Sequence, residues 1–200
     1  MLDLLYKGGV VMIPLGLASL LALTVFLERL YVLRKSKVAP SRLLAQVEEL
    51  LKRGAVSEAL LICRQDPSPL ARIAAAGLAA RPDKRQEAME DAGRVCHVLL
   101  KRFVGVLGTT AVIGPLLGLL GTVTGMISVF QDVTVYGVGN PADLAQGIWE
   151  ALITTVAGLS LAIPCYIAYR FALSRVESLL MTLEEAGGHL LSLMEPGARE

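Results

Sequence analysis

Threonine side chains interrupt two long apolar stretches of this sequence and offer hydrogen-bonding chemistry there. Thr122 lies in an uncharged run at 103–131, and Thr155 lies in another at 151–169. A threonine in a membrane helix usually donates its hydroxyl to the carbonyl one turn earlier in the same helix. We expect this arrangement by default for any single threonine here, and Thr122 and Thr155 are the two for which a functional role stays open.

Aspartate, glutamate, lysine, arginine and histidine are absent from the deep part of every long apolar stretch. The nearest are Glu28 after the run at 8–27, Asp132 after the second run and Glu150 before the third. A proton or ion relay within a membrane normally needs an ionisable group at that depth. If this chain conducts protons, a partner must therefore supply the carboxylate.

Small residues recur at helical spacing in the same stretches. They are separated by four, three and four residues, so each set falls on one face of a helix. The sets are Gly114, Gly118, Gly121 and Gly125 in the second run, and Ala151, Thr155, Gly158 and Ala162 in the third. Small residues let membrane helices approach closely. We predict that these glycines pack two helices together, in preference to forming a binding site.

Enzyme motifs are not found. The sequence has no phosphate-binding loop, no G-x-S-x-G elbow, no H-E-x-x-H and no G-x-G-x-x-G. Cys63, Cys96 and Cys165 form no zinc or disulfide pattern, and His97 has no clustered partner, so we expect it to be a polar helix residue. We therefore predict neither an enzyme nor a cofactor or metal site, and a net charge of +1 gives no reason to expect nucleic-acid binding.

The composition indicates an integral membrane protein. Hydrophobic residues make up 54% of the chain and charged residues only 18%. Each of the three uncharged runs, 8–27, 103–131 and 151–169, has the roughly 20 residues that a transmembrane helix needs. We predict an all-α integral membrane protein with three transmembrane helices, two of them extended into the cytoplasm, and a small helical cytoplasmic region. The first run is too long for a signal peptide and we expect it to be retained.

The distribution of lysine and arginine predicts the orientation. Residues 34–102 contain fourteen of the nineteen, whereas residues 132–150 contain none. By the positive-inside rule, the N-terminus and residues 132–150 face the periplasm, and the C-terminus is cytoplasmic. The predicted parts are an N-terminal segment with the first span (1–33), a cytoplasmic region (34–102), the second span (103–131), a periplasmic loop (132–150), the third span (151–169) and a cytoplasmic helix and tail (170–200).

Local signals predict short helices in the cytoplasmic region. Ser41 can cap a helix that stops at Gly54, Ser57 can start a second, and an alanine-rich third spans about 70–80. We expect Glu28 and Arg29 to form a solvated boundary of the first span, with an ion pair between subunits as the alternative.

Two long helices are expected to carry the second and third spans. Asp83 and Gln86 resemble a capping box, and one helix is predicted from Lys84 to about Gln131, interrupted at most locally at Pro115. The segment 137–141 is predicted to be a turn. The third helix should continue past its span and break at 187–188, where two glycines are adjacent.

These motifs together resemble the MotA/TolQ/ExbB proton-channel family, and specifically its ExbB/TolQ branch. The resemblance covers nearly the whole chain and rests on the Glu28-Arg29 pair, on the sequence GLLGTVTG at 118–125, and on EALITTVAGL at 150–159 followed by AIP at 162–164. The MotA branch has four spans, so three predicted spans favour the ExbB/TolQ branch.

The resemblance implies a homopentamer whose second and third spans line a pore in a bacterial inner membrane. The pore would hold the helices of two copies of an ExbD- or TolR-like partner, whose aspartate accepts the proton. Thr122 and Thr155 match the family's pore threonines, and Glu150 matches an acidic residue at the outer mouth. The motor would drive an outer-membrane process such as TonB-dependent uptake, with a TonB- or TolA-like protein as a further partner.

Three alternatives stay open. The motor could be of the Tol-Pal envelope-maintenance type, the chain could form a non-conducting oligomeric scaffold, or it could be a channel that needs no partner. The absence of a deep carboxylate leaves the choice between H⁺ and Na⁺ to the partner.

Overall fold

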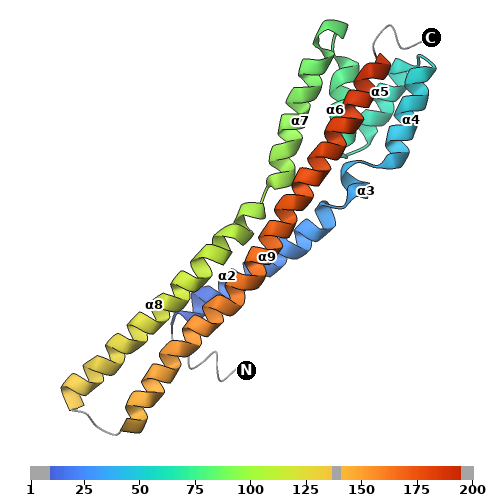
Figure 1. The fold of residues 1–200 in the computed structure, drawn as a ribbon. Helices are drawn as coiled ribbons and strands as arrows, with labels where there is room; N and C mark the ends of the chain where they lie inside the picture. The colour runs from blue at the N-terminus through green and yellow to red at the C-terminus, as the bar shows by residue number, and fades with distance from the viewer. Residues whose placement is uncertain (1–9, 137–140, 195–200) are drawn as a thin grey trace. The chain divides into compact units, whose positions relative to one another are not determined.

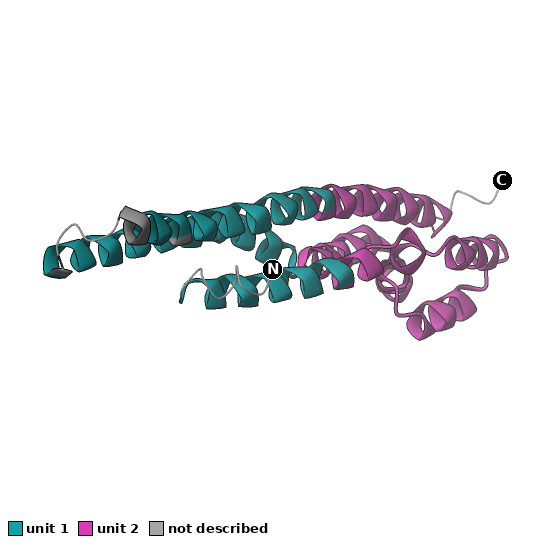
Figure 2. Ribbon diagram, turned by 90° about the horizontal axis from the view of Figure 1, so that it is seen from below, with its two compact units in different colours: residues 1–27, 103–171 teal, residues 28–102, 172–200 magenta. Residues whose placement is uncertain are grey.

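The structure, a computed structural model, describes residues 10–136 and 141–194, without the side chains of residues 136, 141–144 and 150. All regular elements in this part are helical (Figure 1). They are α2 (Met12–Val32), α3 (Lys35–Val38), α4 (Ser41–Lys52), α5 (Val56–Gln65), α6 (Pro69–Ala79), the 3₁₀ turn η1 (Pro82–Lys84), α7 (Arg85–Lys101), α8 (Val104–Tyr136) and α9 (Pro141–Met194). The chain divides into two compact units, coloured separately in Figure 2.

The first unit, residues 1–27 and 103–171, contains the long apolar helices. Among the described residues, three helical stretches are long and apolar enough to cross a membrane, and they include α2, nearly all of α8 and most of α9. Large apolar side chains such as Leu116, Val156 and Ile163 are exposed on this unit, as expected for surfaces that meet lipid or other helices. The predicted all-α membrane fold with three apolar spans is confirmed.

Helix α2 packs against α8 and α9 through two small apolar clusters. Met12 and Leu15 contact Ile153 of α9 in one cluster. Ala22 packs with Leu107 of α8 and Cys165 of α9 in the other. The three helices of this unit therefore pack against one another. The described residues contain no strand.

The prediction of one long helix from Lys84 to Gln131 is wrong, because the helix is interrupted between α7 and α8. Arg102 has an extended ψ of 140°, and Phe103 has a φ of 61°, in the left-handed region that an aromatic residue seldom adopts. The Leu100 carbonyl near this break accepts a hydrogen bond from the Arg29 guanidinium at 3.2 Å. Pro115, in contrast, lies inside an unbroken α8.

The break predicted at Gly187-Gly188 is also wrong, because α9 continues to Met194. Ala186, Leu190 and Met194 are buried along this part of the helix. Burying such side chains yields roughly 1.5–3 kcal/mol for each large one, which outweighs about 1 kcal/mol of helix propensity lost per glycine.

Much of the segment 132–150, which is predicted to be a loop, is helical. Helix α8 ends at Tyr136 and α9 begins at Pro141. Residues 137–140, where a turn is predicted, lie outside the described residues. The assignment of this segment to the periplasm stays a prediction.

The second unit, residues 28–102 and 172–200, holds the short helices together with α7 and the end of α9. Helix α4 buries Leu43, Val47 and Leu51 on one face. The helix ends at Lys52, and Gly54, two residues later, has a φ of 76° in the left-handed region, which agrees with the predicted stop at this glycine. The prediction of a Ser41 cap is wrong, because Pro40 occupies the N-cap and Ser41 is the first helical residue.

Two further predictions about helix ends have different outcomes. The alanine-rich helix is confirmed as α6, and the Ser68 side chain caps it by accepting a hydrogen bond from the Ala71 N–H at 3.3 Å. The prediction of a capping box at Asp83 and Gln86 is wrong. Asp83 lies in the 3₁₀ turn η1, and the Gln86 amide donates to Glu90 at 2.9 Å instead of reaching back.

Arg29 is not the solvated boundary residue that we expected. Its side chain is only 5% exposed, and it pairs with Glu28 at 2.5 Å while donating to the Leu100 carbonyl. A buried guanidinium requires such partners, since an unpaired buried charge is costly. Arg29 therefore holds the end of α7 within its own chain, whereas the exposed side of Glu28 fits the solvated boundary.

Candidate functional site

Thr122 lies on α8 and is partly exposed. Its hydroxyl donates to the Leu119 carbonyl in the preceding turn at 2.7 Å. Thr124 does the same with Leu120 at 2.9 Å. This is the default arrangement for a membrane threonine, so the Thr122 oxygen keeps its acceptor capacity toward whatever lies beside this face of α8.

Thr155 departs from that default. Its hydroxyl crosses from α9 to α8 and donates to the Gly118 carbonyl at 3.0 Å. In an α-helix the same carbonyl accepts from the backbone N–H four residues later, which belongs to Thr122. The Gly118 carbonyl is thus the point at which the two predicted threonines come together in one chain.

The glycines of the α8 stripe face α9 at distances that leave no room for a side chain. A Cβ atom on Gly118 would lie 2.9 Å from the Thr155 Cα, and one on Gly121 would lie 2.5 Å from the Thr154 hydroxyl. The corresponding distances are 3.0 Å from Gly114 to the Gly158 carbonyl and 2.9 Å from Gly125 to the Ala151 Cβ. Contacts shorter than about 3 Å would force the helices apart.

Gly158, on the α9 side, lies against the backbone of α8. A Cβ atom there would lie 2.5 Å from the Gly114 carbonyl oxygen and 3.1 Å from the Gly118 Cα. Because the obstructing atoms belong to the backbone, no change of rotamer could relieve the contact. The five predicted packing glycines therefore all lie at the α8–α9 contact.

Thr154 is a contact residue that the sequence analysis did not single out. Its side chain is 1% exposed, it donates to the Ala151 carbonyl at 2.6 Å, and it packs against Gly121. The signal was present, since Thr154 lies three residues after Ala151 and four before Gly158, on the small-residue face.

Glu150 belongs to the helical backbone of α9, but its side chain lies outside the described residues, and its predicted place at an outer mouth stays a prediction. Among the described residues, no group of three or more His, Cys, Asp or Glu side chains could hold a metal ion.

The two cysteines of the second unit are buried thiols. Burial, together with the charge of Asp66, raises the pKa of Cys63 to about 11, and burial also raises the pKa of Cys96. A raised pKa lowers the fraction of reactive thiolate, so these side chains behave as core residues.

Comparison with known protein families matches residues 65–185 to the MotA/TolQ/ExbB proton channel family. The chain belongs to this family. The match runs from the end of α5 through α6, α7 and α8 and over most of α9, so it includes both threonines and every packing glycine.

Similar proteins place this chain in the ExbB-like branch of the family. It is 36% identical to the biopolymer transport protein ExbB-like 1 of Synechocystis sp., over 97% of this chain and 78% of that protein. An ExbB homolog of Methanothermobacter thermautotrophicus is 30% identical over 92% of this chain and 66% of that protein. The Tol-Pal system protein TolQ of Pseudomonas aeruginosa is 35% identical over 46% of this chain and 43% of that protein.

Family membership and the three apolar helices together describe an ExbB/TolQ-like member of a proton channel family that spans the membrane several times. Both arms of the branch appear among the relatives, because ExbB-like and TolQ proteins match.

Proposed function

We propose that this chain is the pore-forming subunit of a motor driven by the proton-motive force in a bacterial inner membrane. Five copies would surround a pore lined by α8 and α9, with the N-terminus in the periplasm and the C-terminus in the cytoplasm. Two copies of an ExbD- or TolR-like partner would place their membrane helices in the pore. Through them, and a TonB- or TolA-like protein, the motor would energise an outer-membrane process such as TonB-dependent uptake.

The observation that carries this proposal is the chemistry of the α8–α9 face. The polar side chains at this contact are hydroxyls, and the chain has no Asp, Glu, Lys, Arg or His between Val104 and Gln131 or between Ala151 and Tyr169. Hydroxyls can hydrogen-bond a protonated or ionised carboxyl group, but they cannot carry the proton through a cycle of ionisation themselves. This face therefore suits a partner that brings the carboxylate.

Thr122 is the residue we propose to face that carboxyl group, since the residue is partly exposed and its hydroxyl oxygen retains acceptor capacity. Thr155 would support the site through the Gly118 carbonyl. Glu150 would lie at the outer mouth. Each proton driven across 100 mV supplies about 2.3 kcal/mol, so substantial mechanical work requires several protons per cycle.

Proton flux into liposomes containing the chain and its partner tests the proposal. Thr122→Val should abolish partner-dependent flux while native mass spectrometry still finds five copies with two partner copies. Thr24→Val is the matched control, because Thr24 lies on α2 and its hydroxyl likewise donates to a carbonyl one turn back, that of Leu20, at 2.8 Å.

Each other outcome identifies an alternative. Assembly without any flux in the unmodified complex would indicate the non-conducting scaffold, and flux without the partner would indicate a self-sufficient channel. Unchanged flux in Thr122→Val would remove Thr122 from the mechanism. The gene for this chain can be returned to a strain that lacks it. Recovery of uptake would then indicate the TonB-linked motor, and recovery of envelope integrity would indicate the Tol-Pal type.

A further inference from the structure

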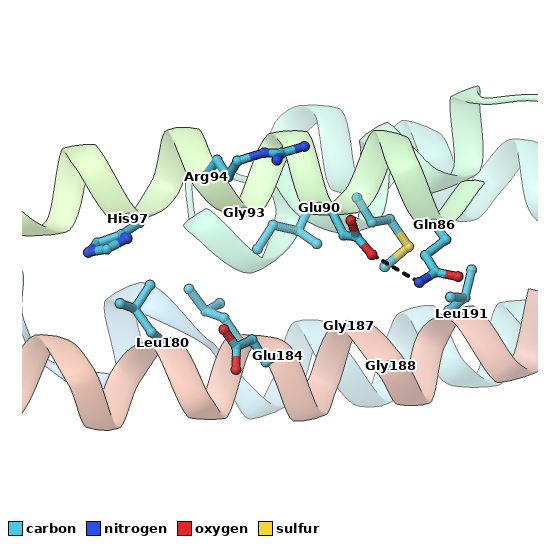
Figure 3. A pocket seen from close by; sticks show the side chains of 13 residues that line it. Gln86, Glu90, Gly93, Arg94, His97, Leu180, Glu184, Gly187, Gly188 and Leu191 are labelled. Carbon is cyan, nitrogen blue, oxygen red and sulfur yellow. Dashed lines mark hydrogen bonds between the residues drawn. The ribbon is translucent and has the colours of Figure 1, made fainter. Parts of the chain in front are cut away.

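A groove of about 480 Å³ lies within the second unit, between α7 and the last part of α9 (Figure 3). Its residues on α7 recur at helical spacing over three turns, and so do its residues on α9. Representative lining residues are Met89, Gly93 and His97 on α7, and Leu183, Gly187 and Leu191 on α9. The groove is thus formed by facing surfaces of α7 and α9, together with Ile73 of α6, and its lining combines leucine, isoleucine and methionine with polar residues.

Glycines keep this groove open on both walls. A Cβ atom on Gly93 or on Gly188 would meet no atom within 4 Å, and one on Gly187 would only reach ordinary contact with Met89 at 3.6 Å. This differs from the α8–α9 contact, where atoms of the facing helix occupy the space beside each glycine. Here glycines border empty space, which a side chain from elsewhere can enter.

Helix α7 also carries an exposed apolar stripe on the side away from the groove. Val95, Val98 and Leu99 are 50%, 72% and 43% exposed. At about 100° per residue, these three positions lie opposite Gly93 and His97 on the helix. Exposed apolar side chains that share one helix face indicate a contact with another surface.

We propose that the groove receives the Val95-Val98-Leu99 stripe of a second copy of this chain. This rests on the homo-oligomer proposed above and names the contact that would hold its second units together. Groove and stripe lie on opposite sides of the same helix, so each copy can offer its stripe to one neighbour and its groove to another. Contacts of this head-to-tail kind form a ring when the rotation from one copy to the next closes on itself.

Charge favours this occupant. Glu90 and Glu184 are exposed at the groove rim, whereas the exposed Lys101 follows the stripe closely. The rim also carries Arg94, but its guanidinium is paired with Asp91 at 2.5 Å. The rim is therefore net acidic toward a stripe whose end is basic, and complementary charges select and orient a partner surface.

Disulfide trapping in the full-length chain tests the contact. Val98→Cys combined with Gly188→Cys should give a ladder of cross-linked copies on oxidation. Val98→Cys combined with Ser178→Cys is the matched control, because Ser178 is exposed on the opposite face of α9. The native cysteines in the described structure are buried, so the unmodified chain should give no ladder.

A second measurement does not depend on disulfide geometry. Gly188→Leu should fill the groove without disturbing the subunit and weaken self-association about tenfold or more, whereas Ser178→Leu should not. Circular dichroism checks that both variants keep their helix content.

The outcomes separate this proposal from the proposed function. Five copies in native mass spectra, with no ladder specific to Gly188 and no effect of Gly188→Leu, would overturn the contact and leave the homo-oligomer intact. A monomer would overturn both. A small molecule or lipid that is retained by the unmodified chain and lost in Gly188→Leu would also overturn the contact, because the groove would then serve another occupant.

Discussion

Gly158→Ala is the most direct test of how closely α8 and α9 approach. The added methyl group would lie 2.5 Å from the Gly114 carbonyl oxygen and 3.1 Å from the Gly118 Cα. Both obstructing atoms are backbone, so the two helices must separate or shift to accept even the smallest side chain. Gly105→Ala is the matched control, since Gly105 lies in α8 and a Cβ atom there would meet nothing within 4 Å.

The magnitude follows from comparing the two variants. Overpacking a close contact costs about 1–3 kcal/mol. Each substitution also gains up to about 1 kcal/mol of helix propensity, and this gain cancels when Gly158→Ala is compared with Gly105→Ala. We therefore expect Gly158→Ala to be less stable than the control by about 1–3 kcal/mol, which is about a 5- to 150-fold difference in the population of the opened form.

Limited proteolysis of the detergent-solubilised chain measures this population. When opening is fast relative to cleavage, the cleavage rate follows the equilibrium fraction that is open. Gly158→Ala should be cut faster than Gly105→Ala, and its thermal transition should be lower. Equal cleavage rates and equal transitions would refute the close contact between α8 and α9 from which the estimate is derived.

Three further perturbations test other parts of the chain. Arg29→Met should cost about 1.5–3 kcal/mol and speed hydrogen exchange near Leu100, whereas Arg53→Met, at an exposed ion pair, should not. The Cys63 thiol should resist alkylation at pH 8 until the chain unfolds. Because folding raises the Cys63 pKa from 9.0 to about 11, stability should be unaffected below pH 9 and fall as the pH rises from 9 to 11. Phe103→Gly should be more stable than Phe103→Ile by about 1–2 kcal/mol in thermal unfolding, because isoleucine is more strained at positive φ.

Features encoded within one or two helical turns could be predicted from the sequence. The three apolar spans follow from uncharged length, and the buried face of α4 follows from the spacing of Leu43, Val47 and Leu51. The stop at Gly54 was predictable because only glycine readily adopts the left-handed conformation that ends a helix.

Features that depend on tertiary contacts could not be predicted. Phe103 adopts a positive φ although its residue type disfavours it, so the end of α7 has no local signal. Gly187 and Gly188 were expected to break a helix that the burial of neighbouring side chains continues. Arg29 was interpreted as solvated because its acceptor, the Leu100 carbonyl, lies 71 residues away in sequence.

In the candidate site, too, local sequence predicts one hydroxyl's hydrogen bond and tertiary packing determines the other's. Thr122 and Thr155 are the same residue type in similar apolar surroundings, yet Thr122 bonds within its own helix and Thr155 bonds to Gly118 on the other. The difference arises because Gly118 has no side chain, which both lets α9 approach and exposes the carbonyl that Thr155 reaches. Packing and hydrogen bonding are therefore inseparable at Gly118 and Thr155, and a substitution at either changes both. Thr122 donates only within α8, so its replacement by valine removes a hydroxyl without removing a helix contact, and a loss of flux there can be assigned to chemistry.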